Sequence, residues 1–428
     1  MSDAEQPSLR RANDNPWYCL ATLYGEQPPD YFDDELAGKN RDAWNQWLGD
    51  MPEGRRRELV THFDRRSGGS MMAPEKTASP DFSRTRFDQR VDFAGFQFPW
   101  LTTFHGSIFS KTAIFKKAFF NDANFTSVKF LLDVDFTSSH LNGSDFQSAT
   151  FSEYADFEAA TFAGVCHFPS VVFSGTADFE AAQFQHGAYF SAVTFFEDAD
   201  FVATTFSGMA KFEEARFSKS ILFVNAKFSA NTIFANARFE SRVPDFRGAT
   251  MHEATEWHGV VWPQPTRNVA DAQNQVYAYE RLKQEMERLK KHEDEQSFFR
   301  RELRVRRGLA RVLSGSWLLN LAYEAFSAYG MSVSRPLFWL FGAFLAGAAI
   351  FARAPLYCGA PMPTKLAAKL SFANLFLFLP DKREIMMNPK MVECLSNSTQ
   401  AISAVQSLFG AVLLFLFGLA LRNRFRMK

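Results

Sequence analysis

The residues that most often carry catalysis or bind metals are few in this chain and lie far apart. The eight histidines are scattered, and the four cysteines form no C-x-x-C pair. His252–Glu253 is followed by Glu256, so the H-E-x-x-H pattern that binds zinc is incomplete. Neither a glycine-rich phosphate loop nor a G-x-S-x-G nucleophile motif occurs. We therefore expect a protein that is not an enzyme and that uses no metal and no cofactor.

Charged residues are the better candidates for function. The chain has 47 basic and 47 acidic residues, which argues against a globally basic nucleic-acid binder. Residues 130–210 nevertheless contain eleven acids and no Lys or Arg. Such a block either keeps a surface soluble or attracts a basic partner. The candidate partner surface comprises Asp156, Glu158, Asp178, Glu180, Glu197, Asp198 and Asp200.

A run of arginines forms the second charged segment. It lies just before the apolar C-terminal part of the chain, so we interpret it as attracted to anionic lipid headgroups. A nucleic-acid patch is the rival interpretation. The residues are Arg300, Arg301, Arg304, Arg306, Arg307 and Arg311.

The structural elements that carry these charges can be predicted from a regular series of phenylalanines. From residue 151 to residue 239 their spacing alternates between six and five, which makes a unit of eleven residues. The series continues over residues 82–262, with about 34 positions in all. The residue two positions earlier is usually small, as at Ala155 and Ala177. The predicted core includes Phe157, Phe162, Phe168, Phe173, Phe179, Phe184, Phe190, Phe195, Phe201, Phe206, Phe212 and Phe217.

A period of five or six fits neither a helix nor an alternating strand, but it fits a solenoid with one short strand on each side of its coil. The stretches ADFEA, ATFAG and ANFTS resemble the repeats of the pentapeptide repeat family, although Thr161 and Lys211 depart from its Asp/Asn preference. The resemblance implies an all-β, right-handed, quadrilateral β-helix over residues 81–262, with about eight coils. Because every second unit has an extra residue, we expect local bulges at the corners.

Helices are expected on both sides of the β-helix. Residues 1–63 are predicted to form a helical cap, in which Leu36, Trp44 and Trp47 share an apolar face. Residues 64–80 are predicted to be a linker. Residues 263–311 are expected to form an amphipathic, Arg-rich helical connector.

Residues 312–428 are predicted to be a membrane domain. The segments 336–352 and 401–421 contain no charge and are expected to span the bilayer. Residues 317–329 suit a helix lying at the interface, and residues 370–379 suit a re-entrant segment. Positive charge before the first span and after the second places both termini in the cytoplasm. We expect a protein of the bacterial inner membrane with two spans.

The order of these membrane segments resembles the two-span pore module of potassium-channel-like proteins, whose T-V-G-Y-G filter is absent here. This resemblance implies a homo-oligomer, a tetramer if channel-like, and makes Phe378 and Gln406 candidates for lining a pore. Gln406 also suits a hydrogen bond between helices. Cys358 and Cys394 are candidates for a disulfide if their loop faces a periplasm.

The leading functional hypothesis is a membrane-anchored scaffold that presents its acidic β-helix to a cytoplasmic protein partner. One alternative is an ion-channel-like pore with a β-helical sensor domain. The other is a DNA mimic that regulates a topoisomerase, as some pentapeptide proteins do. The expected partners are the lipid bilayer and a protein, and no nucleic acid is expected.

Overall fold

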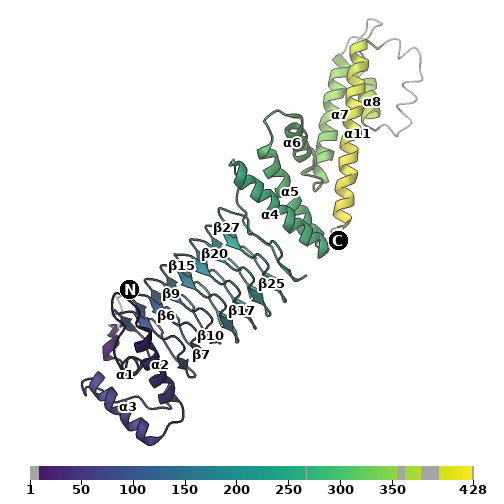
Figure 1. Ribbon diagram of the computed structural model, residues 1–428. Helices are drawn as coiled ribbons and strands as arrows, with labels where there is room; N and C mark the ends of the chain where they lie inside the picture. The colour runs from purple at the N-terminus through teal and green to yellow at the C-terminus, as the bar shows by residue number, and fades with distance from the viewer. Residues whose placement is uncertain (1–8, 267, 354–361, 377–394, 427–428) are drawn as a thin grey trace, which may run out of the picture. The chain divides into compact units, whose positions relative to one another are not determined.

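The structure is a computed structural model that describes residues 9–266, 268–353, 362–376 and 395–426. The chain divides into two compact units, Met1–Gln264 and Pro265–Lys428, and each is described by itself (Figure 1). The first unit is a β-solenoid with helices at its N-terminal end. The second unit is entirely helical in the described residues.

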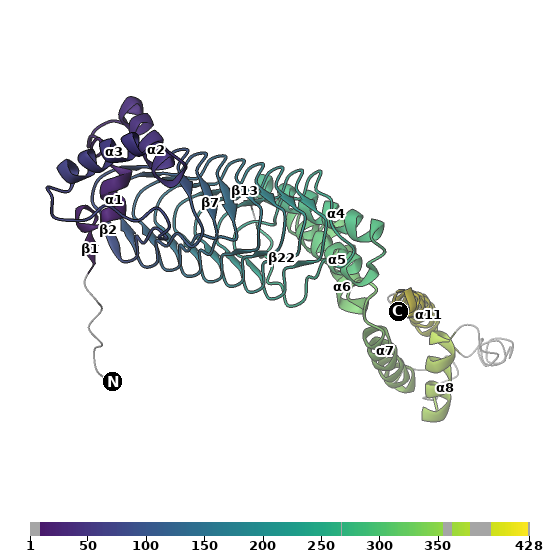
Figure 2. The same cartoon turned by 90° about the horizontal axis from the view of Figure 1, so that it is seen from below.

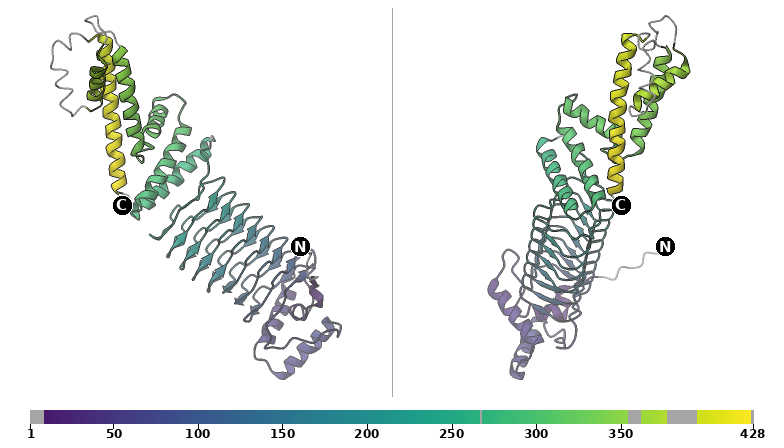
Figure 3. Two further views of the ribbon diagram at one scale, coloured as in Figure 1. Left: turned by 180° about the vertical axis from the view of Figure 1, so that it is seen from behind. Right: turned by 90° about the vertical axis from the view of Figure 1, so that its right-hand side faces the viewer.

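Short parallel strands build the four sides of the solenoid (Figures 1 and 3). One sheet contains β1 (Arg10–Arg11), β2 (Thr85–Phe87), β5 (Ile108–Phe109), β8 (Lys129–Phe130), β11 (Thr150–Phe151), β15 (Val172–Phe173), β19 (Thr194–Phe195), β23 (Arg216–Phe217) and β27 (Arg238–Phe239). The next, called the β3–β24 sheet, contains β3 (Val91–Asp92), β6 (Ala113–Ile114), β9 (Val134–Asp135), β12 (Ala155–Asp156), β16 (Ala177–Asp178), β20 (Ala199–Asp200) and β24 (Ile221–Leu222).

Two further sheets complete the coil. The β4–β25 sheet contains β4 (Gln97–Phe98), β7 (Phe119–Asn121), β10 (His140–Asn142), β13 (Thr161–Phe162), β17 (Gln183–Phe184), β21 (Thr205–Phe206) and β25 (Lys227–Phe228). The β14–β26 sheet contains β14 (Cys166–His167), β18 (Ala188–Tyr189), β22 (Ala210–Lys211) and β26 (Thr232–Ile233). From β2 to β27 the first sheet makes seven steps, which correspond to about seven turns. Isolated bridges such as Arg238–Val261 continue the coil beyond β27, in agreement with the prediction of about eight coils.

Stacked phenylalanine rings fill the interior. Phe157 pairs in register with Phe179 one turn later, and their ring centroids lie 4.8 Å apart with nearly parallel planes. All the predicted inward positions from Phe82 to Trp262 are buried, with exposed fractions of 8% or less. The small residues two positions earlier, such as Ala155 and Ala177, are buried as well. The predicted core, including the twelve phenylalanines from Phe157 to Phe217, is therefore confirmed.

The alternation of six and five corresponds to two kinds of corner. After Phe157 the chain makes a tight turn, in which the N–H of Ala160 donates to the carbonyl of Phe157 at 3.0 Å. Ala159 in this turn has a φ of 53°. The six-residue segments instead bend without such a turn, and a Cβ added at Gly175 would lie 2.5 Å from the carbonyl oxygen of Glu153 one turn below. The expected bulges are thus alternate corners of a regular coil.

The N-terminal helices cover the first turn of the solenoid (Figure 2). They are η1 (Ala12–Asp14), α1 (Pro16–Ala21), α2 (Asp34–Leu48) and α3 (Glu53–Arg66). The carboxylate of Asp33 begins α2 by accepting from the N–H of Leu36 at 3.0 Å. Trp44 is fully buried, and its ring lies 5.4 Å from that of Phe98. Because α3 extends to Arg66, the first residues of the predicted linker 64–80 are helical.

The second unit begins with the antiparallel pair α4 (Val269–Arg288) and α5 (His292–Leu309), followed by α6 (Gly315–Ser327). The helices α7 (Ser334–Arg353) and α11 (Asn397–Arg426) are long and apolar enough to cross a membrane. They contain the predicted spans 336–352 and 401–421. The C-terminal end of α11 returns to the earlier helices, since Asn423 donates to the carbonyl of Gly330 at 3.1 Å.

The helix α8 (Thr364–Leu375) begins six residues before the predicted re-entrant segment 370–379. Its residues Leu370 and Ala373 are buried in a cluster with Phe351 of α7, and Leu375 packs with Leu413 of α11. Residues 377–379 of the predicted segment lie outside the described residues.

Candidate functional site

The acidic residues of the solenoid are stacked in register on the β3–β24 sheet. Asp135, Asp156, Asp178 and Asp200 are direct partners from one turn to the next. Each carboxylate also accepts the N–H two residues later, as Asp178 does from Glu180 at 2.8 Å and Asp200 from Val202 at 2.7 Å. These aspartates therefore shape the turn as well as charge the surface.

Ten of the eleven acids between residues 130 and 210 lie on this sheet or within two residues of it. We call these ten residues the acidic face: Asp133, Asp135, Glu153, Asp156, Glu158, Asp178, Glu180, Glu197, Asp198 and Asp200. Asp145 is the exception, because it bridges to His167 of the β14–β26 sheet. All seven residues of the predicted partner surface belong to the acidic face, so the fold brings them together.

The carboxylates of the acidic face repel one another. Burial raises the pKa of Asp156, the N–H of Glu158 opposes this, and the charges of Asp135 and Asp178 raise it further. Burial likewise raises the pKa of Asp200, with a contribution from Asp178. Among the described residues, a single ion pair to the acidic face occurs, between Glu197 and Lys219 at 3.5 Å. The face thus keeps most of its negative charge uncompensated.

Exposed apolar side chains accompany the acidic face. Leu131, Leu132, Tyr154 and Phe196 lie at the corner that leads into the β3–β24 sheet, and each is exposed. The hydroxyl of Tyr154 donates to Asp178 at 2.9 Å, so this ring lies against the acidic ladder. A surface that combines charge with exposed aromatic and aliphatic groups is typical of protein interfaces. These four residues were missed from the sequence, although they lie in the repeat immediately before the acidic strands.

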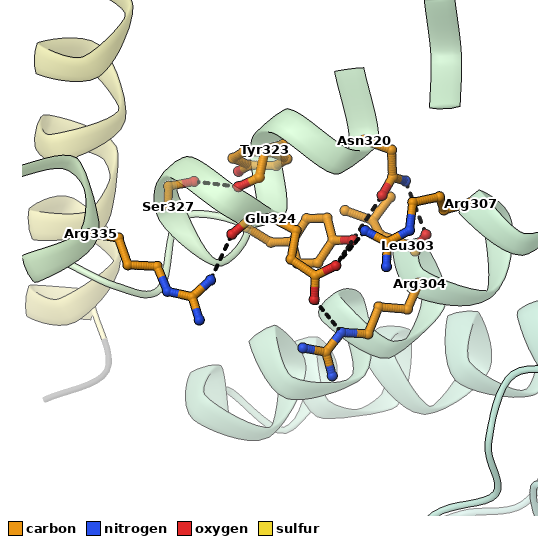
Figure 4. Close-up of polar contacts among 9 residues, drawn as sticks. Leu303, Arg304, Arg307, Asn320, Tyr323, Glu324, Ser327 and Arg335 are labelled. Carbon is orange, nitrogen blue, oxygen red and sulfur yellow. Dashed lines mark hydrogen bonds and ion pairs between the residues drawn. The ribbon is translucent and has the colours of Figure 1, made fainter. Parts of the chain in front are cut away.

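A second polar cluster joins α5, α6 and the start of α7 (Figure 4). The carboxylate of Glu324 accepts from Arg304 at 2.7 Å and from Arg307, both on α5. Arg335 on α7 donates to the backbone carbonyl of Glu324 at 2.8 Å. Burial raises the pKa of Glu324, but the hydrogen bonds from Arg304 and Arg307 outweigh this effect and lower the pKa below its ordinary value.

The polar stripe of α6 faces protein rather than water. Asn320 donates to the carbonyl of Leu303 at 3.0 Å and accepts from the hydroxyl of Tyr329 at 2.8 Å. Ser327 is fully buried. The leucines of α6 are exposed instead, with Leu319 at 73%. The helix is amphipathic, with its polar side against protein and its leucines exposed, and its position at a membrane interface stays a prediction.

The arginine run is divided among different partners. Arg304 and Arg307 contact Glu324, whereas Arg306 pairs with Glu302 at 2.7 Å and Glu280 at 3.5 Å. Burial lowers the pKa of Arg300 and of Arg301, which are both half-buried on α5. Arg311 is exposed. The six arginines therefore do not form one uniform surface for headgroups, because three of them pair with acids of the chain.

Gln406 lies in a buried polar network between α7, α8 and α11. Its amide nitrogen donates to the carbonyl of Ala343 at 3.0 Å and to the hydroxyl of Ser371 at 2.7 Å. Its amide oxygen accepts from Asn374 at 3.1 Å, and Asn374 accepts in turn from Ser403 at 2.8 Å. Gln406 thus bonds helices to one another, which is the alternative to lining a pore. Asn374 and the two serines were missed from the sequence.

The remaining predicted residues do not gather into a site. Phe378, Cys358 and Cys394 lie outside the described residues. Cys19 and Cys166 are buried free thiols. In the part of the chain that the structure describes, no three His, Cys, Asp or Glu side chains are grouped as metal ligands would be.

The repeats also match a family of known sequences. Residues 212–261 match the family model of pentapeptide repeats, which spans nine copies. No curated protein matches the chain significantly. Solenoids of this family are generally structural folds without catalysis, and they suit protein interaction. The stacked four-sided coil and the family match together show that the chain contains a pentapeptide repeat solenoid.

Proposed function

We propose that this chain is a non-enzymatic scaffold, anchored in the bacterial inner membrane, whose solenoid binds a basic protein partner in the cytoplasm. The observation that carries this proposal is the acidic face, where ten carboxylates lie on one side of the solenoid. Uncompensated charge of one sign steers an oppositely charged partner and speeds its association. The regular coil holds these charges at fixed spacing, because neighbouring strands are about 4.8 Å apart.

The apolar residues beside the acidic face support a protein rather than a small cation as the partner. Charge pairs at the rim of an interface contribute little affinity, whereas buried aromatic and aliphatic side chains contribute most of it. Tyr154 and Phe196 are 38% and 48% exposed and are available for such burial. The partner is therefore expected to combine Lys or Arg side chains with an apolar anchor.

The apolar helices support the membrane anchor. A helix of 20 residues such as α7 spans about 30 Å, the thickness of the hydrocarbon core. Arg335 precedes its apolar segment, and Arg422, Arg424 and Arg426 end α11. Because positive residues remain on the cytoplasmic side, this distribution favours a hairpin with both termini and the solenoid in the cytoplasm.

The test compares proteins that co-purify with the full-length chain and with a variant of the acidic face. The variant carries Asp156→Asn, Glu158→Gln, Asp178→Asn and Glu180→Gln. Asparagine keeps an oxygen that accepts the turn N–H, so the fold is retained while four charges are removed. We expect capture of the partner to fall roughly tenfold, which corresponds to about 1.4 kcal/mol.

The matched control removes the same number of charges beside the β14–β26 sheet. It carries Asp145→Asn, Glu213→Gln, Glu214→Gln and Glu256→Gln. This control should capture the partner as well as the unmodified chain does. If both variants lose the partner equally, or if neither loses any protein, the acidic face is not a docking surface.

A further inference from the structure

The junction of α5, α6 and α7 carries more positive charge than its acidic residue compensates. Arg304, Arg307 and Arg335 all donate to Glu324, yet Arg335 reaches its backbone carbonyl and not its carboxylate. One carboxylate therefore serves two guanidinium groups directly, and a third remains without an acidic partner among the described residues. In Figure 4 Arg304 contacts the Glu324 carboxylate through Nε, and one terminal nitrogen of Arg335 contacts the Glu324 backbone carbonyl, so the terminal nitrogens of Arg304 and the second terminal nitrogen of Arg335 make no contact with Glu324.

Arg300 adds a fourth positive charge to the same junction. It lies one helical turn before Arg304 on α5, and its buried Nε has no hydrogen-bond partner in the described part of the chain. Burial lowers the pKa of Arg300, and the charges of Arg304 and Arg335 lower it further, so these three side chains lie close enough to repel. Glu324 opposes this effect only in part. An uncompensated group of arginines calls for an anion, and guanidinium groups bind phosphate oxygens particularly well.

The surroundings of this junction are apolar and exposed. Val312 and Leu313, in the turn between α5 and α6, are 67% and 72% exposed. Leu319 of α6 is exposed as well, and Phe338 is 72% exposed one turn after Arg335 on α7. Aliphatic side chains next to arginines, at the start of an apolar helix, fit the boundary between headgroups and acyl chains.

We propose that Arg300, Arg304 and Arg335 bind the phosphate of an anionic lipid headgroup, while Val312, Leu313 and Leu319 enter the acyl layer beside it. The site specifies phosphate chemistry, and the apolar residues assign the phosphate to a lipid rather than to a free anion. Glu324 is then a positioning residue, because it holds Arg304 and Arg307 in place and makes no contact with the terminal nitrogens of Arg304. This inference rests on the membrane anchor of the proposed function but not on the acidic face.

The experiment measures which lipids stay bound to the full-length protein. The chain is reconstituted in nanodiscs of an equimolar mixture of phosphatidylglycerol and phosphatidylcholine, released into mild detergent, and analysed by native mass spectrometry. We expect phosphatidylglycerol to be retained over phosphatidylcholine. The variant Arg300→Gln/Arg335→Gln should weaken this retention about thirtyfold, which corresponds to about 2 kcal/mol for the two arginines together. The single variant Arg311→Gln, from the same arginine run, should retain the lipid.

Several outcomes would overturn the proposal. Equal losses in the double variant and in Arg311→Gln would indicate general charge attraction without a site. Release of the lipid by millimolar inorganic phosphate would assign the site to a free anion. The variant Arg300→Lys/Arg335→Lys keeps the charge and must retain more lipid than the glutamine variant, while circular dichroism verifies that all variants are folded.

The same samples separate this inference from the proposed function. Capture of the protein partner should be unchanged in the Arg300→Gln/Arg335→Gln variant, because the acidic face is intact. A chain that can be washed from membranes at alkaline pH would contradict the anchor itself. A chain that remains in the membrane but retains both lipids equally would contradict only the phosphate site.

Discussion

The aspartates before the inward phenylalanines have a structural role that is separate from their charge. Asp156, Asp178 and Asp200 each accept a backbone N–H two residues later, so a side chain completes the turn. Asparagine serves equally well, since Asn124 accepts from Thr126 at 2.8 Å. Aspartate and asparagine can therefore form the same turn, and the acidic face is distinguished by having aspartate at these positions.

Single glycines are required where one turn of the coil approaches the next. At Gly175 a side chain would meet the backbone of Glu153, which lies in the short connection between the paired strands β11 and β12. We expect Gly175→Ala to lower the free energy of unfolding by about 2 kcal/mol, in the range of overpacked sites. Chemical denaturation followed by circular dichroism would measure the change.

A glycine without neighbours provides the control for this prediction. A Cβ at Gly54 of α3 would have no atom within 4 Å. Gly54→Ala should cost no stability, because alanine favours a helix by about 1 kcal/mol over glycine. Equal stability of the two alanine variants would contradict the close approach between turns.

The connection from α6 to α7 depends on a few side chains in a strained turn. Ala328, Tyr329 and Gly330 are three successive residues with positive φ. For residues other than glycine this conformation costs about 1–2 kcal/mol each. Tyr329 offsets part of that cost through its hydroxyl, which donates to Asn320 at 2.8 Å and to Glu324 at 3.3 Å. The same Glu324 that binds the arginines therefore fixes the path of the chain into α7.

At the scale of elements, α8 is held between α7 and α11 by polar as well as apolar contacts. Gly347 and Gly410 allow this close approach, because a Cβ at Gly410 would lie 2.8 Å from the Cα of Leu375. The buried amide of Asn374 bonds to Gln406 and Ser403. Small residues and hydrogen-bonded amides are the usual means by which helices associate in membranes.

The stacked carboxylates of the β3–β24 sheet make the stability of the solenoid depend on pH. The pKa of Asp156 and of Asp200 is raised above its ordinary value, so the folded chain binds protons that the unfolded chain releases. Stability should therefore rise as the pH falls from neutral through these raised values, until it approaches the ordinary carboxyl range of about 4. Thermal unfolding at several pH values would measure this.

Other carboxylates limit how far the stability of the folded state can rise as the pH falls. Lys76 lowers the pKa of Asp50, and Arg55 lowers that of Glu58, so protonation of these two acids destabilises the folded state. The variant Asp156→Asn/Asp200→Asn should be more stable at neutral pH and should gain less on acidification. A melting temperature that only falls from neutral pH downward would contradict the prediction.

At the scale of the whole molecule, the buried amide of Gln406 on the apolar helix α11 finds its partners within one chain. The amide nitrogen of Gln406 donates to α7, and its amide oxygen accepts from α8. This side chain is therefore not needed for a hydrogen bond to a second copy of the chain. We expect the protein in lipid nanodiscs to have the mass of a single chain, measured by mass photometry. A closed ring of about four copies would instead favour the pore hypothesis, because two spans of one chain cannot enclose a conduction path.

The sequence by itself determined the solenoid and its core. Thirty-four inward positions repeat one rule, and a pattern repeated so often leaves no alternative register. The presence of α7 and α11 followed from composition, since long uncharged segments need little tertiary information, although α11 has 30 residues and extends beyond the predicted span 401–421 at both ends. The sequence showed that acids are concentrated in residues 130–210. That they lie on one side of the coil became clear only from the strand register, which pairs residues 22 apart such as Asp156 and Asp178.

Only the tertiary structure decided which polar groups meet. Glu324 and Arg304 are 20 residues apart, and Asn374 and Gln406 are 32 residues apart, so no local spacing links them. The arginine run looked uniform in sequence, yet the packing of α5 against α4 and α6 gave Arg306 a partner in Glu280 of α4 and Arg307 a partner in Glu324 of α6. Repeats are determined locally because each turn copies the last, whereas contacts between unlike helices depend on how their side chains pack.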